Sequence, residues 1–280
     1  MIPTGFDYAA PESLDEAIQA LTRGGEDAKL LAGGHSLIPL MKLRLAAPSL
    51  LVDLRRVPGL HGVQRDDGTV RIGAMTRHAE LQVDDSLGVV ARAAGMIADQ
   101  QVRNRGTIGG SLAHGDPASD LPAVLLATEG SVTAQGPSGQ REIAAGDLFR
   151  DYLTTALAAD EVLTEVRMPV TDGWGFGYQK FTRRSEDWAM VGVCALVKKA
   201  GDGSCEDVRI GLTNMGSTPL RASAAEAALR GSGLDASALA SAAEQAGEGT
   251  DPPGDLNATP EYKKHLVRVL CRRALEEAAG

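Results

Sequence analysis

Apolar positions in about the first 55 residues follow two spacings, one typical of helices and one typical of strands. Residues 14–21 carry apolar side chains every three or four positions, directly after a capping-box sequence that begins at Ser13. A second helical face covers residues 37–45. The short apolar runs at 29–32 and 50–54 are typical of buried strands. This pattern predicts a compact β–α–β–α–β unit.

From about residue 56 to residue 170 strands and helices are mixed, and the turn-forming residues 169–173 end the section. Thr76 is expected to cap a short helix, and Asp120 to cap a helix that carries a run of Val and Leu. The segment 99–106 is expected to be a loop. Strands are predicted at 69–72, 131–135 and 161–168, and a further helix at 87–98.

The last part of the chain has a different pattern. Three strand patterns follow one another closely enough for an antiparallel meander, and three helical patterns come after them. Strands before helices favour an α+β domain. The strands are expected at 174–182, 189–198 and 208–213, and the helices at 221–230, 235–246 and 259–278. The sequence therefore predicts three regions, 1–55, 56–170 and 171–280.

Composition and charge exclude several classes of function. The 280 residues are 43% hydrophobic and 23% charged, as in ordinary globular proteins. The net charge of −9 argues against nucleic-acid binding, because phosphate binding needs a concentrated basic face. The lack of a membrane-length apolar run and of a secretory signal favours a cytoplasmic protein, either free or peripheral at the inner face of the membrane. Three isolated cysteines suggest neither a disulfide framework nor a zinc or iron–sulfur site.

Two glycine-rich segments carry the candidate chemistry. The sequence AGGHSLIPLMKLR starts at Ala32, where a predicted strand ends, and TIGGSLAHGDPASDLP starts at Thr107. Glycine lets backbone amides approach a diphosphate with no Cβ in between, and the start of the following helix adds a favourable partial charge. Neither segment is a GxGxxG motif or a P-loop, so each signal is weak by itself, because many strand-to-helix junctions use glycine only to turn.

If the two segments met in space, they would cradle one extended dinucleotide between two subdomains. Asp116 and Asp120 follow the glycines of the second segment, and an aspartate there would accept hydrogen bonds from ribose hydroxyls. The alternatives are structural. Asp120 would then be only a helix cap, and Asp116 a turn residue before Pro117.

Four sequences, in the same order, resemble those of a known family. AGGHSLIPLMKLR, QVRNRGTIGGSLAHGDPASDLPA, YQKFTRRSEDWA and GLTNMGSTPL are similar to segments of the medium, FAD-binding subunit of aerobic carbon monoxide dehydrogenase and its relatives among the molybdenum hydroxylases of the xanthine oxidase family. The similarity extends from near Phe6 to the final helix. Four motifs in the correct order are far more specific than either glycine segment alone.

The resemblance implies an α+β fold. Two N-terminal subdomains would bind FAD as in proteins of vanillyl-alcohol-oxidase type, followed by a C-terminal domain of a three-stranded antiparallel sheet with helices. FAD would be bound non-covalently. Asp120 would contact its adenosine part or hold the loop, Asp116 is a weaker candidate for the same role, and Leu163 would give an apolar contact. The residues implied for the two sides of the cofactor are Ala32, Gly33, Gly34, His35, Ser36 and Leu37, and Thr107, Gly109, Gly110 and Ser111.

The resemblance also implies three residues near the flavin. Lys180 matches a cofactor-proximal lysine, whose charge would favour an anionic reduced flavin and raise its potential; the alternative is a surface lysine on an edge strand. Trp188 matches an aromatic residue near the flavin ring, with core packing as the alternative. His35 is expected to be a positioning donor and not a covalent attachment point. Three other histidines are interpreted as surface or packing residues: His61, His78 and His265.

The implied role of the chain is electron transfer within an oxidoreductase complex. Electrons from a molybdenum cofactor in a large subunit would reach FAD through [2Fe–2S] clusters in a small subunit and then pass to an external acceptor. The resemblance implies a dimer of heterotrimers, with the substrate set by the large subunit. It assigns this chain no metal and no catalytic side chain. Two alternatives stay open: a self-sufficient FAD-dependent oxidase or dehydrogenase, and a non-catalytic assembly module.

Overall fold

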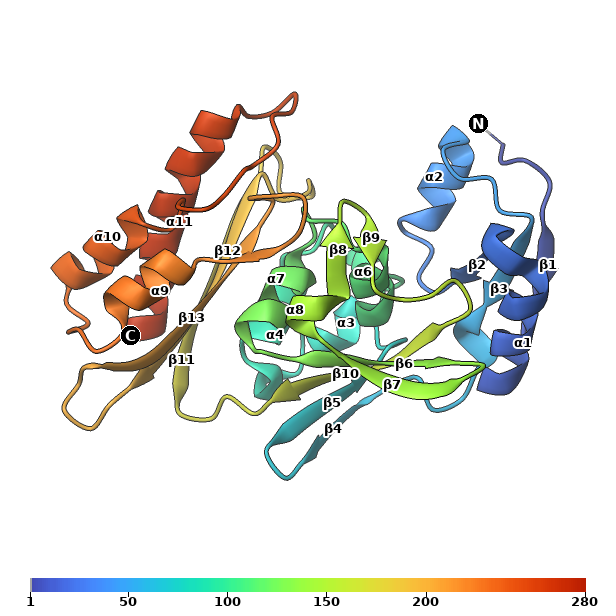
Figure 1. Cartoon of the computed structure of the whole chain (residues 1–280), viewed down its shortest axis with the longest axis horizontal. Coiled ribbons are helices and arrows are strands. Elements are labelled where there is room, and N and C mark those ends of the chain that lie inside the picture. Colours follow the sequence, from blue (N-terminus) through green and yellow to red (C-terminus); the bar gives the residue numbers. More distant parts are fainter. Residues whose placement is uncertain (1) are drawn as a thin grey trace.

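Three units of secondary structure follow one another along the chain and lie side by side in a computed structural model that describes residues 2–280 (Figure 1). The N-terminal unit lies at one end, a middle unit built on an antiparallel sheet lies at the centre, and the C-terminal unit lies at the other end. Each unit has its own sheet. No helix among the described residues is long and apolar enough to cross a membrane.

The N-terminal unit is a parallel three-stranded sheet with strand order β1-β3-β2. Helix α1 begins where the Ser13 side chain accepts a hydrogen bond from the Glu16 amide, as the capping-box sequence predicts. The apolar face of α1 is buried against the sheet. The predicted β–α–β–α–β order is confirmed. The elements are β1 (Asp7–Ala9), α1 (Leu14–Gly24), η1 (Gly25–Asp27), β2 (Ala28–Leu31), α2 (Leu37–Leu43), β3 (Leu50–Asp53) and η2 (Leu54–Arg56).

The middle unit is a five-stranded antiparallel sheet with strand order β4-β5-β10-β6-β7, and its helices pack on one face (Figure 1). The edge strands β4 and β7 were not predicted, because most of their side chains are polar and exposed and show no apolar alternation. The elements are β4 (Val63–Asp66), β5 (Thr69–Gly73), α3 (His78–Leu81), η3 (Asp85–Leu87), α4 (Val89–Gly95), α5 (Gln100–Arg103), α6 (Ile108–His114), α7 (Asp120–Ala127), β6 (Ser131–Gly136), β7 (Gly139–Ala144), α8 (Ala145–Leu148), β8 (Phe149–Asp151), β9 (Thr154–Thr155) and β10 (Val162–Pro169).

Three local predictions for the middle unit are wrong. Thr76 does not cap α3, because its hydroxyl exchanges hydrogen bonds with the backbone of Gly62. The expected loop 99–106 contains α5, which starts where the Asp99 side chain accepts from the Val102 amide. Asp120 is the first residue of α7 and not its N-cap, which is Ser119.

The C-terminal unit is an antiparallel sheet with strand order β11-β12-β13-β14 and three helices. The predicted three-stranded sheet is extended by a fourth strand, β14, whose two residues are too few to show a strand pattern. Helix α11 lies so close to β11 that a Cβ on Gly175 or Gly177 would collide with carbonyl oxygens of the helix. The elements are β11 (Trp174–Phe181), β12 (Val191–Lys199), β13 (Cys205–Thr213), β14 (Leu220–Arg221), α9 (Ser223–Leu229), α10 (Ala236–Glu244) and α11 (Pro260–Ala279).

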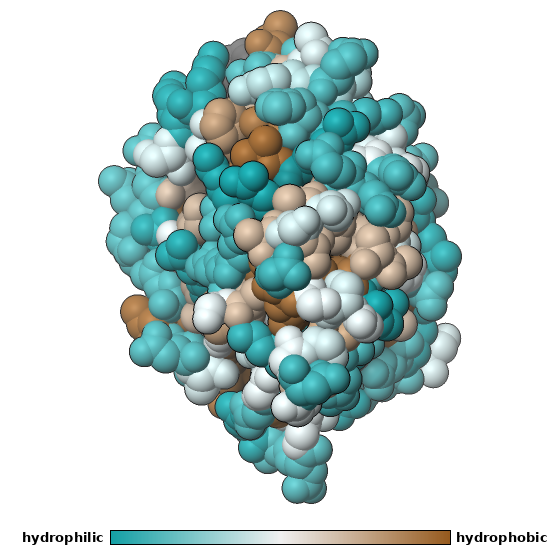
Figure 2. All heavy atoms as spheres, turned by 90° about the vertical axis from the view of Figure 1, so that its left-hand side faces the viewer, coloured by the Kyte–Doolittle hydropathy of each residue, from teal (hydrophilic) through white to brown (hydrophobic). Residues whose placement is uncertain are grey.

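The C-terminal sheet is buried on both faces. One face packs on the three helices of its own unit. The other face contributes Tyr178, Cys194 and Leu196 to the core of the middle unit. Figure 2 views the molecule from the C-terminal end of Figure 1, where hydrophilic residues surround a central area of weakly hydrophobic ones.

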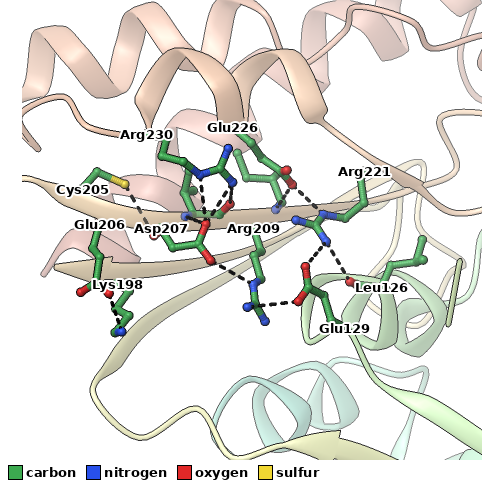
Figure 3. Close-up of polar contacts among 12 residues, drawn as sticks. Leu126, Glu129, Lys198, Cys205, Glu206, Asp207, Arg209, Arg221, Glu226 and Arg230 are labelled. Carbon is green, nitrogen blue, oxygen red and sulfur yellow. Dashed lines mark hydrogen bonds and ion pairs between the residues drawn. The ribbon is translucent and has the colours of Figure 1, made fainter. Parts of the chain in front are cut away.

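Ion pairs join the middle and C-terminal units beside this shared core (Figure 3). Glu129, which follows α7, pairs with Arg209 of β13 at 3.1 Å and with Arg221 of β14 at 3.4 Å. Arg221 also pairs with the largely buried Glu226 of α9 at 2.6 Å. These contacts fix the C-terminal unit against the end of α7, the helix that begins at Asp120.

Candidate functional site

A cleft of about 620 Å³ opens between the N-terminal and middle units, and the start of the C-terminal unit borders it. Its walls come from the segment after β2, from α3, α6 and β10, and from the end of β11 with the loop that follows. Its size and its mixed lining are typical of cofactor sites. The predicted site residues that line the cleft are Ala32, Gly33, Gly34, His35, Ser36, Leu37, Thr107, Gly109, Gly110, Ser111, Asp120, Leu163, Lys180 and Trp188.

Asp116 lies outside this set. Its Oδ1 accepts a hydrogen bond from the Ala118 amide at 2.9 Å, and its carbonyl oxygen accepts one from the Ser119 amide at 3.0 Å. This arrangement is a turn stabilised by the aspartate side chain. Asp116 therefore shapes the connection between α6 and α7, as its structural alternative proposed, and does not form part of the cleft wall.

The two glycine segments approach each other closely. A Cβ on Gly33 would lie 2.4 Å from the carbonyl oxygen of Arg105 and 2.7 Å from the Cα of Gly106, closer than real Cβ atoms come. A Cβ on Gly110 would lie 3.6 Å from that of Ala32. The segments are far apart in the sequence, but they form adjacent walls of one cleft.

The backbone of both segments explains their glycines. Gly34 has φ of 78°, a left-handed conformation that side chains other than glycine rarely adopt. The Thr107 side chain caps α6 by accepting a hydrogen bond from the Gly110 amide at 3.2 Å. The Gly109 amide donates to the carbonyl oxygen of Ala74 at 2.8 Å, which ties the start of α6 to the residue after β5. The backbone of both segments is therefore fixed at the wall of the cleft.

A buried network joins the cleft to the C-terminal unit. Asp120 accepts a hydrogen bond from the Tyr178 hydroxyl at 2.5 Å and one from Lys180 Nζ at 2.9 Å. Lys180 Nζ also donates to the carbonyl oxygen of Met96 at 3.0 Å. The Lys180 and Asp120 side chains are only 3% and 4% exposed, although β11 is an edge strand. The alternative of a surface lysine is therefore wrong. Buried charges persist only when they are paired and hydrogen-bonded, so the three groups depend on one another.

The protonation states in this network follow from burial and hydrogen bonding. Burial raises the pKa of the Asp120 carboxyl, and the charge of Lys180 and the bonds from Tyr178 and Lys180 oppose that shift. Burial and then the Asp120 charge raise the pKa of the Tyr178 hydroxyl well above its usual value, so Tyr178 stays protonated and donates to Asp120. Tyr178 was not predicted, although its spacing of two from Lys180 in a strand places both side chains on one face.

Leu163 and Trp188 both line the cleft but differ in their exposure to solvent. Leu163 is buried and lies where the register between β10 and β6 shifts. Trp188 lies in the loop after β11 and is 55% exposed. The core-packing alternative for Trp188 is wrong, because a core tryptophan would be buried.

Three histidines line the cleft: His35, His78 and His114. His35 is exposed, and its partial burial and then the charge of Arg105 lower its pKa. His78, interpreted from the sequence as a surface or packing residue, is 4% exposed and belongs to the cleft wall. His61 and His265 are exposed. In the sequence, the only signal for His78 is a polar residue at the start of a predicted short helix.

His78 makes the stability of the chain depend on pH. Burial, and then the charges of His35 and Arg103, lower its pKa from the usual 6.5 to about 4. The unfolded chain takes up this proton near pH 6.5 and the folded chain only near pH 4, so folding loses stability as the pH falls through this window. We expect the cofactor-free chain to lose about 2 kcal/mol of unfolding free energy through His78 between pH 7 and pH 5. Urea unfolding at several pH values measures the loss, and His78→Gln should abolish it. Equal pH dependence in both proteins would contradict this expectation.

Two family models match consecutive parts of the chain. Residues 4–171 match the FAD binding domain in molybdopterin dehydrogenase, and residues 176–278 match the CO dehydrogenase flavoprotein C-terminal domain. Together with the cleft between the first two units, these matches define a flavoprotein of the molybdopterin dehydrogenases.

Individual relatives match over nearly their whole length. The carbon monoxide dehydrogenase medium chain of Hydrogenophaga pseudoflava is 42% identical, over 99% of this chain and 98% of the relative. The 6-hydroxypseudooxynicotine dehydrogenase complex subunit alpha of Paenarthrobacter nicotinovorans is 40% identical, over 99% of this chain and 96% of the relative. A solved structure of carbon monoxide dehydrogenase from H. pseudoflava superposes with a TM-score of 0.96 at 44% identity, over 99% of this chain and 98% of the other. The chain belongs to the FAD-binding medium subunits of the carbon monoxide dehydrogenase and xanthine dehydrogenase family of molybdenum hydroxylases.

Proposed function

We propose that this chain is the electron-transfer subunit of a molybdenum hydroxylase complex. FAD in the cleft would connect [2Fe–2S] clusters of a small partner subunit with an external electron acceptor, while a molybdenum cofactor in a large partner subunit acts on the substrate. The observation that carries the proposal is the cleft itself, in which both glycine segments and Lys180 line one space. When bound, FAD supplies electron transfer that amino-acid side chains do not.

The residues of the cleft fit a dinucleotide. Gly33 has no Cβ at the point where the two segments meet, and Gly34 adopts a left-handed backbone conformation. We assign residues 32–37 to one side of FAD and the segment Thr107 to Ser111, apart from Ile108, to the other. Leu163 gives the apolar contact and His35 a polar one. The glycines let the backbone of both segments approach a ligand without side-chain bulk, and the amides of Gly109 and Gly110 already donate within the chain.

We assign Lys180 to set the charge of the cleft next to the flavin. Its ammonium is fixed by Asp120 and by the carbonyl oxygen of Met96. A fixed positive charge stabilises added negative charge nearby, most strongly where water is excluded. Both carboxylate oxygens of Asp120 already accept hydrogen bonds, which favours the role of holding Lys180 over contact with the adenosine.

Trp188 is expected to tune the flavin more than to retain it. Its ring is largely exposed at the border of the cleft, so its removal leaves the glycine segments intact. Trp188→Ala should shift the flavin absorption spectrum or reduction potential and weaken FAD affinity by only about fivefold, because stacking contributes about 1 kcal/mol. Absorption spectroscopy and a potentiometric titration measure both effects. Unchanged spectrum and potential would remove Trp188 from the flavin environment.

The partners are proposed from the relatives. Several relatives are named medium chains or medium subunits, among them nicotine 6-hydroxylase of P. nicotinovorans. We propose a large molybdenum subunit and a small [2Fe–2S] subunit as partners, in a dimer of heterotrimers. The named relatives act on different compounds, so the large subunit would determine the substrate.

Isolation of the native complex tests the proposed function. We expect two partner chains to copurify, FAD to be released intact when the protein is denatured, and substrate to bleach the flavin without oxygen only when the partners are present. Reduction of the isolated chain by an organic substrate would instead indicate a self-sufficient enzyme. A complex that turns over normally without flavin would indicate an assembly module.

A further inference from the structure

His78 lies where both glycine segments come together. A Cβ on Gly106 would lie 2.7 Å from His78 Cδ2 and 3.0 Å from His78 Nε2, so this edge of the imidazole packs directly on Gly106. Gly106 in turn lies against Gly33 of the first segment. The ring therefore touches the residue that separates the two segments, and it lines the same cleft.

The backbone around His78 is tied to the second segment. The His78 amide donates to the carbonyl oxygen of Gly106 at 3.0 Å, and the Ile108 amide donates to that of Thr76 at 3.0 Å. Between these bonds Arg77 and Thr107 form a β-bridge. The position of the imidazole is therefore fixed relative to the glycines that start α6.

Neither nitrogen of this ring has a hydrogen-bond partner among the described residues. Nδ1 of His78 is buried and unpaired in a side chain that is only 4% exposed. An unpaired buried N–H is rarer and costlier than an unpaired acceptor, so the neutral ring carries its proton on Nε2. The donor then lies on the edge beside Gly106, between the two glycine segments.

The charges of the cleft give such a donor a role. Among the cleft-lining residues of the described chain the lysines are Lys29 and Lys180, and no arginine lines it. Lys180 is already paired with Asp120. An anionic dinucleotide would therefore depend on uncharged donors for most of its hydrogen bonds, and imidazole is a strong one.

We propose that His78 is a further FAD-binding residue, whose Nε2–H donates a hydrogen bond to the cofactor from the cleft wall. The proposal rests on the proposed function, because it requires FAD in this cleft. It assigns His78 a binding role that an apolar side chain of similar size would not fulfil.

Substitutions of His78 in the full chain test the hydrogen bond. His78→Leu keeps an apolar side chain in the wall and should weaken FAD binding roughly five- to tenfold, the value of one uncharged hydrogen bond. His78→Gln, whose amide nitrogen approximates Nε2, should stay within about threefold of the wild type. His78→Asn, which approximates Nδ1, should resemble His78→Leu. His61→Leu, an exposed position outside the cleft, is the matched control and should not change the affinity.

Imidazole NMR separates a contact with FAD from simple packing. The chain has five histidines, so ¹⁵N-histidine labelling gives few signals, which single His→Gln variants assign. We expect His78 to be the Nε2–H tautomer and its Nε2 signal to shift when FAD is added, while His61 and His265 do not respond. An unchanged His78 signal with FAD bound, or equal affinities for His78→Leu and His78→Gln, would overturn the inference but leave the proposed function intact. Failure of the wild-type chain to bind FAD would overturn both.

Discussion

Gly33→Val should abolish FAD retention by this chain. The new Cβ would lie 2.4 Å from the carbonyl oxygen of Arg105 and 2.7 Å from the Cα of Gly106, so backbone must move apart. Overpacking of this kind costs about 1–3 kcal/mol, and it acts where the two walls of the cleft meet. We therefore expect FAD affinity to fall by roughly a hundredfold. Flavin absorbance per purified chain and FAD titration measure the loss.

The matched control for Gly33→Val is Gly146→Ala. A Cβ on Gly146 meets no atom within 4 Å, so flavin content should be unchanged. The C-terminal sheet and helices pack around their own core, so they should stay folded in both variants. Normal flavin content in Gly33→Val would show that the cofactor does not lie between the two glycine segments.

Asp120→Ala should destabilise the folded chain by about 3–5 kcal/mol, because it leaves a buried charge without its partner. Lys180 would keep one bond, to the carbonyl oxygen of Met96, and the Tyr178 hydroxyl would lose its acceptor. Replacement of the whole pair by apolar side chains, Asp120→Leu with Lys180→Met, should recover part of this loss, because no buried charge then remains. Urea unfolding of the single and double variants measures both effects.

The Lys198–Glu206 pair is the control for this experiment. Its two side chains are 41% and 48% exposed with a contact of 2.6 Å, and the pair, labelled in Figure 3, lies where β12 ends and β13 begins. Glu206→Ala should therefore cost less than about 1 kcal/mol. Equal losses for Asp120→Ala and Glu206→Ala would contradict the structural importance of the buried network.

Local signals in the sequence predicted much of the fold. The capping box at Ser13 placed α1, and the glycines after β2 and in the first turn of α6 belong to the two segments that line the cleft. Such features are encoded within a few neighbouring residues. Edge strand β7 and the two-residue β14 lack a local pattern, because pairing with a neighbouring strand defines them.

The parts of the site that could not be predicted depend on contacts between distant residues. The sequence correctly indicated a helix start near Asp120, but its carboxylate bonds to Tyr178 and Lys180 on β11 instead of capping α7. His78 belongs to the cleft because a β-bridge sets α3 beside the second glycine segment. No spacing in the sequence reports either contact, since each forms only when the units pack together.

The hydrogen bonds of Asp120 also restrict which N-terminal and C-terminal parts can be combined in one chain. Asp120 lies in the part that matches the first family model, whereas Tyr178 and Lys180 lie in the part that matches the second. A chimaera that joined the first part to a foreign second part would need a hydroxyl and an ammonium group at the same two places. Without them it would enclose a solitary carboxylate. A substitution at Asp120 in the first part therefore requires matching substitutions at Tyr178 and Lys180 in the second.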